Sequence, residues 1–217
     1  MTDKLLIVPG FRGSGPAHWQ SWLERKIPSS QRVEGIDWYT PSLPRWAEKI
    51  GRAIDASPQP LWIIAHSFGC LATAAAVAQQ PRKIAGVILV APADPERFAV
   101  SGLRTSLDRI PEPSIAQLLP PTALGVNGLL IASTNDPWLT LDGARSMARR
   151  WHLPLFNAGA VGHINTDSGF GPWPFLVSLL YALQFEARSS RDNVVSFHPR
   201  LHARESRELS PRQLAYL

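Results

Sequence analysis

The feature that most constrains the fold is a run of eighteen residues, 61–78, that contains no Asp, Glu, Lys or Arg. A run of this length reaches the lower limit for a membrane-spanning helix. Its composition is uneven, however, because the first five residues suit a strand and the last ten are rich in alanine and favour a helix. Since His66, Ser67 and Gly69 stand between these two parts, we predict a buried strand, a sharp turn and a helix.

Short apolar runs alternate with helical periodicity along most of the chain. The expected strands are residues 4–8, 33–38, 61–65, 86–91, 128–133 and 153–157, and the expected helices are residues 17–26, 43–56, 68–79, 141–151 and 174–187. Apolar runs without in-and-out alternation are typical of parallel strands covered on both faces by helices. The pattern predicts an α/β fold with a doubly wound, mostly parallel sheet of about six strands. In the proline-rich residues 92–126 we expect one helix and loops.

A chain of 217 residues with 45% hydrophobic and 18% charged residues has the composition of one globular domain. The net charge of +5 is unevenly distributed, since residues 188–217 hold six arginines and three acidic residues, whereas residues 1–187 hold sixteen basic and fourteen acidic ones. We therefore expect a nearly neutral α/β domain over residues 1–187. Residues 188–217 would form a basic C-terminal extension whose few aliphatic residues favour flexibility.

Cysteine usage and the first residues bear on the compartment. The single cysteine, Cys70, excludes an intrachain disulfide, which favours a reducing compartment. The apolar run at residues 5–8 is broken by Pro9 and Gly10 and is shorter than the roughly 7 to 15 residues of a signal-peptide core. We expect a cytoplasmic protein.

The sequence Ala65-His66-Ser67-Phe68-Gly69 stands where the expected strand gives way to the helix. A serine at such a turn is typical of a nucleophile elbow, in which small residues two positions before and after the serine let backbone segments approach closely. Ala65 and Gly69 meet this need, although glycine is usual at the earlier position. The alternative is a serine that only caps the helix. For His66 we expect a structural role.

A serine nucleophile needs a histidine base, which in turn needs an orienting carboxylate. Where a nucleophile elbow is used, the chain order is serine, acid, histidine. Asp136 and His163 follow the last two expected strands in this order. Their placement favours a triad of Ser67, Asp136 and His163. Asp94 also follows an expected strand and is the competing carboxylate.

A tetrahedral intermediate needs backbone N–H groups directed at its oxyanion. One donor of an elbow is the amide of the residue after the serine, here Phe68, and the other comes from an early strand-to-helix loop. The glycine-rich residues 9–15 follow the first expected strand, and the Phe11 amide is our candidate for the second donor. This loop lacks the glycine spacing and the Lys-Ser or Lys-Thr pair of phosphate-binding loops.

Four aromatic side chains flank these positions. His18 and Trp19 open the first expected helix, and Trp138 and Trp173 follow the candidate acid and the candidate base. Each is a candidate wall of the substrate pocket, with packing in the protein interior as the alternative. Cys70, close behind the elbow, fits a small buried packing residue better than a nucleophile.

Several motifs together resemble one known family. They are Gly-Pro-Ala-His-Trp-Gln-Ser-Trp (residues 15–22), Ala-His-Ser-Phe-Gly (65–69), Asn-Asp-Pro (135–137), Gly-His-Ile-Asn (162–165) and Ser-Gly-Phe-Gly-Pro-Trp-Pro (168–174). In this order the chain resembles, over about residues 4–187, the retinoblastoma-binding protein 9-like (YdeN-like) small serine hydrolases. The resemblance implies a three-layer α/β-hydrolase fold without a large lid, and it implies Ser67, Asp136 and His163 as the triad.

Motifs and resemblance together predict a serine hydrolase that cleaves small ester, thioester or activated amide substrates through an acyl-enzyme on Ser67. His163 would act as general base and acid, and Asp136 would orient it. A carboxylesterase-like activity (EC 3.1) is favoured, with amidase or peptidase activity left open. The alternative is a catalytically weak scaffold that acts as a protein-interaction module, although the Leu-x-Cys-x-Glu peptide associated with retinoblastoma-protein binding is absent from the sequence.

The expected partner is a small-molecule acyl substrate. No His or Cys cluster has metal-ligand spacing, so we expect neither a metal nor an organic cofactor. A nucleic-acid partner would rest on the basic charge alone, so we expect none, and we expect no membrane partner. The sequence leaves the oligomeric state open.

Overall fold

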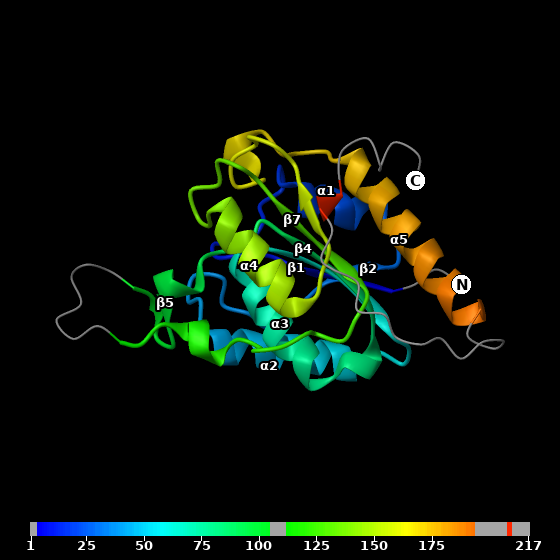
Figure 1. Cartoon of the computed structure of the whole chain (residues 1–217), viewed down its shortest axis with the longest axis horizontal. Helices are drawn as coiled ribbons and strands as arrows, with labels where there is room; N and C mark the ends of the chain where they lie inside the picture. The colour runs from blue at the N-terminus through cyan, green and yellow to red at the C-terminus, as the bar shows by residue number, and fades with distance from the viewer. Residues whose placement is uncertain (1–3, 105–111, 194–207, 210–217) are drawn as a thin grey trace.

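The computed structural model describes residues 4–104, 112–193 and 208–209 of the chain. Within these residues one sheet has seven strands in the order β2-β1-β3-β4-β7-β8-β9, and every neighbouring pair is parallel (Figure 1). The strands are β1 Leu5–Val8, β2 Ser30–Arg32, β3 Leu61–His66, β4 Ile84–Val90, β7 Gly128–Ala132, β8 Leu155–Asn157 and β9 Glu208–Leu209. The predicted α/β fold with a mostly parallel sheet is confirmed.

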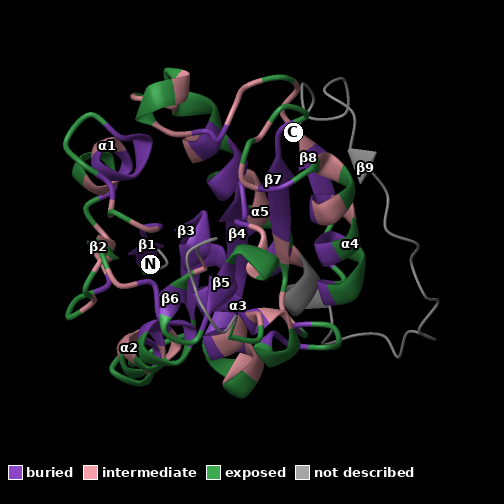
Figure 2. Ribbon diagram, turned by 90° about the vertical axis from the view of Figure 1, so that its left-hand side faces the viewer, coloured by how far each residue is buried: buried purple, intermediate pink, exposed green. Residues whose placement is uncertain are grey.

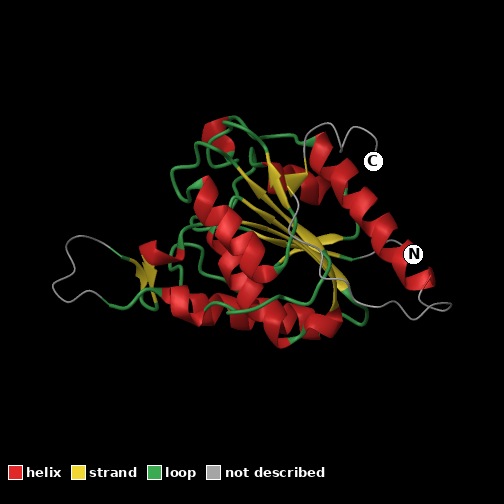
Figure 3. Ribbon diagram, viewed as in Figure 1, coloured by secondary structure: helices red, strands yellow, loops and turns green. Residues whose placement is uncertain are grey.

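Helices cover both faces of the sheet, which gives three layers (Figure 3). The α-helices of the described residues are α1 Trp19–Lys26, α2 Leu43–Asp55, α3 Phe68–Gln79, α4 Leu141–Trp151 and α5 Pro174–Asn193. Apolar side chains of α2, α3 and α4 pack on one face, and those of α1 and α5 pack on the other. No helix in the described part of the chain is long and apolar enough to cross a membrane.

The two-sided cover explains why the strands lack polar alternation. In β1, Leu6 and Val8 pack on the face of α2 and α3, whereas Leu5 and Ile7 pack on the face of α1 and α5. All four residues are buried, as are all residues of β3 and β4 (Figure 2). Successive side chains of a strand point to opposite faces, so a sheet covered on both sides needs apolar residues at every position.

The second strand is not at residues 33–38, where the apolar pattern predicted it. The edge strand is instead the polar segment Ser30–Arg32, which pairs with β1. Val33 still donates its N–H to the Ile7 carbonyl and buries its side chain, but Gly35, with φ of 72°, then turns the chain. Apolar residues at this place mark a loop packed on the core, whereas the strand itself lies at an edge where polar side chains stay hydrated.

Residues 92–126 form no α-helix in their described part, contrary to the prediction of one helix. They contain the short 3-10 helices η2 Pro95–Arg97 and η3 Ile115–Leu118 and a two-stranded antiparallel hairpin of β5 Phe98–Ala99 and β6 Gly102–Leu103. The hairpin lies at the left-hand end of the molecule in Figure 1. Two further 3-10 turns, η1 Pro81–Lys83 and η4 Thr166–Ser168, follow α3 and β8. Frequent prolines limit such segments to short turns because they remove backbone donors.

The expected domain boundary at residue 187 falls inside a helix. Helix α5 continues without a break from Pro174 to Asn193. The strand β9 pairs with β8 through Leu155 with Glu208 and Phe156 with Leu209. The remainder of the predicted extension, residues 194–207 and 210–217, lies outside the described residues.

Candidate active site

Ser67 stands on a tight turn between β3 and α3. Its backbone has φ of 55° and ψ of −127°, a conformation that is costly for a residue with a Cβ atom. Its side chain makes no capping hydrogen bond to the helix, so the structure does not give it the capping role that was the alternative. The hydroxyl is instead left at the carboxyl end of a central strand, where open α/β sheets place their sites.

Two glycines make this turn sterically feasible. A Cβ atom on Gly69 would lie 2.3 Å from the Pro9 carbonyl oxygen, and one on Gly10 would lie 2.6 Å from the Ser67 Cβ. Both distances are far below van der Waals contact, so larger residues would force the backbone apart. The glycine-rich loop after β1 is thereby packed directly against Ser67.

The three residues of the predicted triad lie together. His163 Nε2 is 2.9 Å from Ser67 Oγ, and His163 Nδ1 is 2.9 Å from each carboxylate oxygen of Asp136. The Asp136 side chain is 3% exposed and that of His163 is 8% exposed. Because the carboxylate accepts only, Nδ1 carries the proton and Nε2 is left to accept from the serine hydroxyl.

Asp136 and Asp94 have different surroundings, although both follow a strand. Asp136 Oδ1 also accepts the backbone N–H of Trp138 at 2.8 Å, which fixes the carboxylate toward His163. The Asp94 side chain accepts the N–H of Glu96 and caps η2. The structure therefore brings Asp136, and not Asp94, to the histidine.

The loop that carries His163 is tied to the loop that carries Asp136. Asn135 Oδ1 accepts the N–H of Gly162 at 2.7 Å, and Ser133 Oγ accepts the N–H of Val161 at 3.1 Å. The sequence analysis assigned no role to Asn135 or Ser133. The Asn-Asp-Pro sequence could have indicated the role of Asn135, because asparagine side chains in such turns readily accept hydrogen bonds from backbone N–H groups.

The two predicted oxyanion donors border Ser67 on both sides. Phe68 follows Ser67 in the chain, and Phe11 follows Gly10, which touches Ser67. The loop is held by hydrogen bonds from Arg12 N–H to the Trp38 carbonyl and from Gly13 N–H to the Gly10 carbonyl. Within the described residues the N–H groups of Phe11 and Phe68 donate no hydrogen bond, so they remain available to an acceptor.

The four aromatic pocket candidates have unequal access to solvent. His18 caps α1, with Nδ1 accepting the N–H of Gln20, and is 4% exposed. Trp19 is fully buried and therefore has no surface along an open pocket. Trp138 and Trp173 are half-buried, and the Trp138 ring centroid is 5.8 Å from that of His163. The half-buried pair has surface that a substrate can contact, whereas the other two have almost none.

Burial controls the titratable groups near the triad. It lowers the pKa of His66 well below the usual range, with neighbouring His163 and His18 adding to the effect. It also lowers the pKa of His18 to about 4, assisted by Arg32 and His163. Both rings are neutral at pH 7, so neither places a positive charge beside His163. Burial raises the pKa of the Cys70 thiol well above its usual range, which leaves it unreactive.

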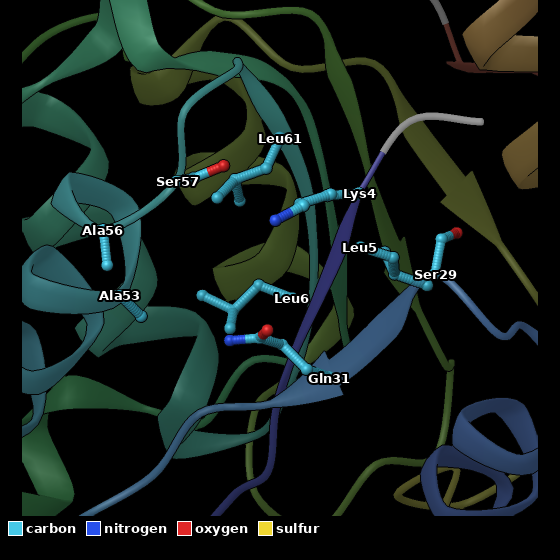
Figure 4. Close-up of a pocket in the computed structure, with 9 residues that line it drawn as sticks. All are labelled: Lys4, Leu5, Leu6, Ser29, Gln31, Ala53, Ala56, Ser57 and Leu61. Atoms are coloured by element: carbon cyan, nitrogen blue, oxygen red, sulfur yellow. The ribbon is translucent and has the colours of Figure 1, made fainter. Parts of the chain in front are cut away.

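The opposite end of the sheet contains a cavity of about 120 Å³ without comparable chemistry (Figure 4). Its lining comes from the start of β1 and β3, from β2 and the residue before it, and from the end of α2 and the residues after it. It consists of Lys4, Leu5, Leu6, Ser29, Gln31, Ala53, Ala56, Ser57 and Leu61. No histidine or carboxylate is among these residues. Within the described ranges, no group of three or more His, Cys, Asp or Glu side chains is arranged to hold a metal ion.

Comparison with known proteins places this arrangement in a family. The sequence profile of the family described as "Serine hydrolase" matches residues 5–182. The chain belongs to this family. YdeN of Bacillus subtilis (strain 168) is 25% identical over 197 residues, which cover 83% of this chain and 95% of YdeN.

Solved structures agree with this assignment. The crystal structure of a YdeN-like hydrolase from Pectobacterium atrosepticum SCRI1043 shares 37% identity and a TM-score of 0.70, covering 87% of this chain and 91% of the other. Est1E from Butyrivibrio proteoclasticus, at 11% identity and a TM-score of 0.59, shares the fold over 89% of each chain. The predicted resemblance to YdeN-like α/β-hydrolases is confirmed.

Proposed function

We propose that this serine hydrolase cleaves small carboxylic esters, thioesters or activated amides through an acyl-enzyme on Ser67. The observation that carries the proposal is the pair of hydrogen bonds, each 2.9 Å long, by which His163 bridges Ser67 and Asp136. A module that only binds other proteins would need neither this bridge nor a strained serine. The contacts therefore favour an enzyme over an interaction scaffold.

Acylation begins when Ser67 Oγ attacks the carbonyl carbon of the substrate. His163 Nε2 takes the hydroxyl proton as the Oγ–C bond forms, and the Asp136 carboxylate stabilises the resulting imidazolium. The neutral His66 and His18 rings leave this charge without a positive neighbour. His163 then gives the proton to the leaving oxygen, sulfur or nitrogen as its bond to carbon breaks.

The carbonyl oxygen becomes negative in the tetrahedral intermediate. The N–H groups of Phe11 and Phe68 are the proposed donors to it, which is supported by their position beside Ser67 and their lack of hydrogen bonds within the described residues. Water then attacks the acyl carbon while His163 takes its proton. The bond from carbon to Ser67 Oγ breaks as His163 returns the proton to Oγ, and the acid product leaves.

A modest substrate fits the small cover over the site. The described part of residues 92–126 supplies only two short turns and one hairpin. Trp138 and Trp173 are the proposed walls of the acyl or alcohol pocket because they retain exposed surface near His163 and Trp19. The indole rings can contact apolar parts of a substrate, and the Arg97 guanidinium, 4.1 Å from the Trp138 ring centroid, places one positive charge beside them.

Covalent labelling with a fluorophosphonate probe tests the nucleophile. The wild type should be labelled, and Ser67→Ala should lose labelling and at least about 99% of its hydrolysis of a p-nitrophenyl ester, because the attacking oxygen is gone. Cys70→Ala is the matched control, since its buried thiol lies three residues away and should leave labelling intact. Equal labelling of wild type and Ser67→Ala would refute the assignment.

A further inference from the structure

A buried hydrogen bond joins the strand of the nucleophile to the backbone of the histidine. His66 Nε2 lies 2.9 Å from the His163 carbonyl oxygen, and the two ring centroids are 4.8 Å apart. His66 is 5% exposed. A carbonyl oxygen only accepts, so the neutral His66 ring carries its proton on Nε2 and donates it.

A second buried donor reaches the next carbonyl of the same loop. The indole N–H of Trp19, at the start of α1, donates to the Ile164 carbonyl at 2.8 Å. Ile164 is fully buried and has φ of 49°. A left-handed conformation is costly for a β-branched residue, so it persists only where surrounding contacts enforce it.

The two donors also support each other. The Trp19 ring meets the His66 ring edge-on with centroids 5.9 Å apart, and the His18 ring meets the His66 ring with centroids 5.1 Å apart. His18 in turn is fixed by its cap on α1. The result is a packed unit that presents two N–H groups to two consecutive carbonyls from different elements of the fold.

We propose that His66 and Trp19 are positioning residues that hold the His163–Ile164 backbone so that His163 Nε2 reaches Ser67 Oγ. Removal of one donor would leave the carbonyl oxygen of His163 or of Ile164 buried without a hydrogen bond. The strained loop would then shift until that oxygen found another hydrogen-bond donor. The His163 imidazole would then no longer hold Nε2 within hydrogen-bond distance of Ser67 Oγ. A displacement of about 1 Å in such a site costs about 100-fold in rate. The kinetic consequence rests on the proposed function, whereas the displacement itself does not.

Four variants separate positioning from packing. His66→Phe and Trp19→Phe each keep a ring and remove one donor, and they test the proposal independently. His66→Gln places an amide N–H donor where Nε2 was. Trp151→Phe is the matched control. The buried Trp151, at the end of α4, also donates its indole N–H to a backbone carbonyl, that of Pro120 at 3.2 Å, but within the described residues it makes no hydrogen bond to the His163 loop.

The expected kinetic pattern is a loss in kcat with little change in KM. His66→Phe and Trp19→Phe should each lower kcat by about 10- to 100-fold, with KM within about twofold of wild type. His66→Gln should recover most of the loss, and Trp151→Phe should retain wild-type kcat even if its unfolding midpoint falls. Loss of kcat in Trp151→Phe equal to that in Trp19→Phe, or wild-type kcat in both donor variants, would overturn the proposal.

Crystal structures of the variants give a readout that needs no activity. In His66→Phe and Trp19→Phe the distance from His163 Nε2 to Ser67 Oγ should exceed hydrogen-bond range, about 3.5 Å. An unchanged bond in both would overturn the proposal. If the wild type fails to hydrolyse esters or react with fluorophosphonate while the variants show a displaced His163, the proposed function fails and the positioning role stands.

Discussion

The backbone around Ser67 and the backbone around His163 are held by different kinds of contact. The turn at Ser67 depends on close approach of backbone segments at Gly10 and Gly69, within a few ångströms of the serine. The loop at His163 is instead held by polar side chains of other elements, including Asn135 and His66. We expect a single added methyl group at Gly69 to disrupt the whole turn at Ser67. In the loop at His163, we expect each hydrogen bond that is removed to cause a partial loss of activity.

The largest expected effect is in the histidine region, at the carboxylate. Asp136→Asn should lower kcat by about 10⁴-fold, because an amide no longer selects the imidazole tautomer with Nδ1–H or stabilises the imidazolium. Steady-state ester hydrolysis measures this loss. Asp94→Asn is the control and should keep kcat within about threefold, since Asp94 only caps η2. A larger loss in Asp94→Asn than in Asp136→Asn would contradict the assignment of the acid.

A methyl group at Gly69 tests the turn at Ser67. Gly69→Ala should destabilise the protein by about 3 kcal/mol or abolish labelling of Ser67, because its Cβ would meet the Pro9 carbonyl oxygen at 2.3 Å. Urea unfolding and fluorophosphonate labelling measure the two outcomes. Gly15→Ala is the matched control, since no atom lies within 4 Å of its added Cβ. Wild-type stability and labelling in Gly69→Ala would show that the close approach is not required.

The buried imidazoles behind the histidine loop predict a dependence of stability on pH. Folded His18 has a pKa of about 4 against an ordinary 6.5, so the unfolded chain binds more protons between these values. Stability is therefore lost as the pH falls through this window, by about 2 kcal/mol at pH 5 from His18 alone. His66 acts in the same direction.

His18→Asn isolates that contribution because asparagine keeps a cap on α1 and does not titrate. Urea unfolding at pH 7 and pH 5 should show a loss about 2 kcal/mol smaller in this variant than in the wild type. The same loss in both proteins would mean that folding does not lower the pKa of His18.

Different parts of the fold could be predicted to different degrees. The sequence predicted the strand, turn and helix around Ser67, because these depend on local residues. It also predicted the order Ser67, Asp136, His163, because each of these residues follows an apolar run typical of a strand. The edge strand at residues 30–32 was missed because its polar side chains give no apolar signal. The burial of Trp19 and the hydrogen bond from His66 to the His163 carbonyl arise where segments far apart in the sequence pack together. No local sequence pattern predicts them.

The short polar strand β2 has a consequence for how the protein behaves in a crowded solution. A strand edge with free backbone groups is a template onto which another chain can add a strand. Here that edge offers only three residues, and Arg32 directs its guanidinium back to Glu24, Ser14 and Ser21 of the same chain. A strand of another molecule would find few backbone groups to pair with and a charged side chain to displace. The short polar strand that the apolar pattern missed therefore makes this edge of the sheet a poor template for pairing with another chain.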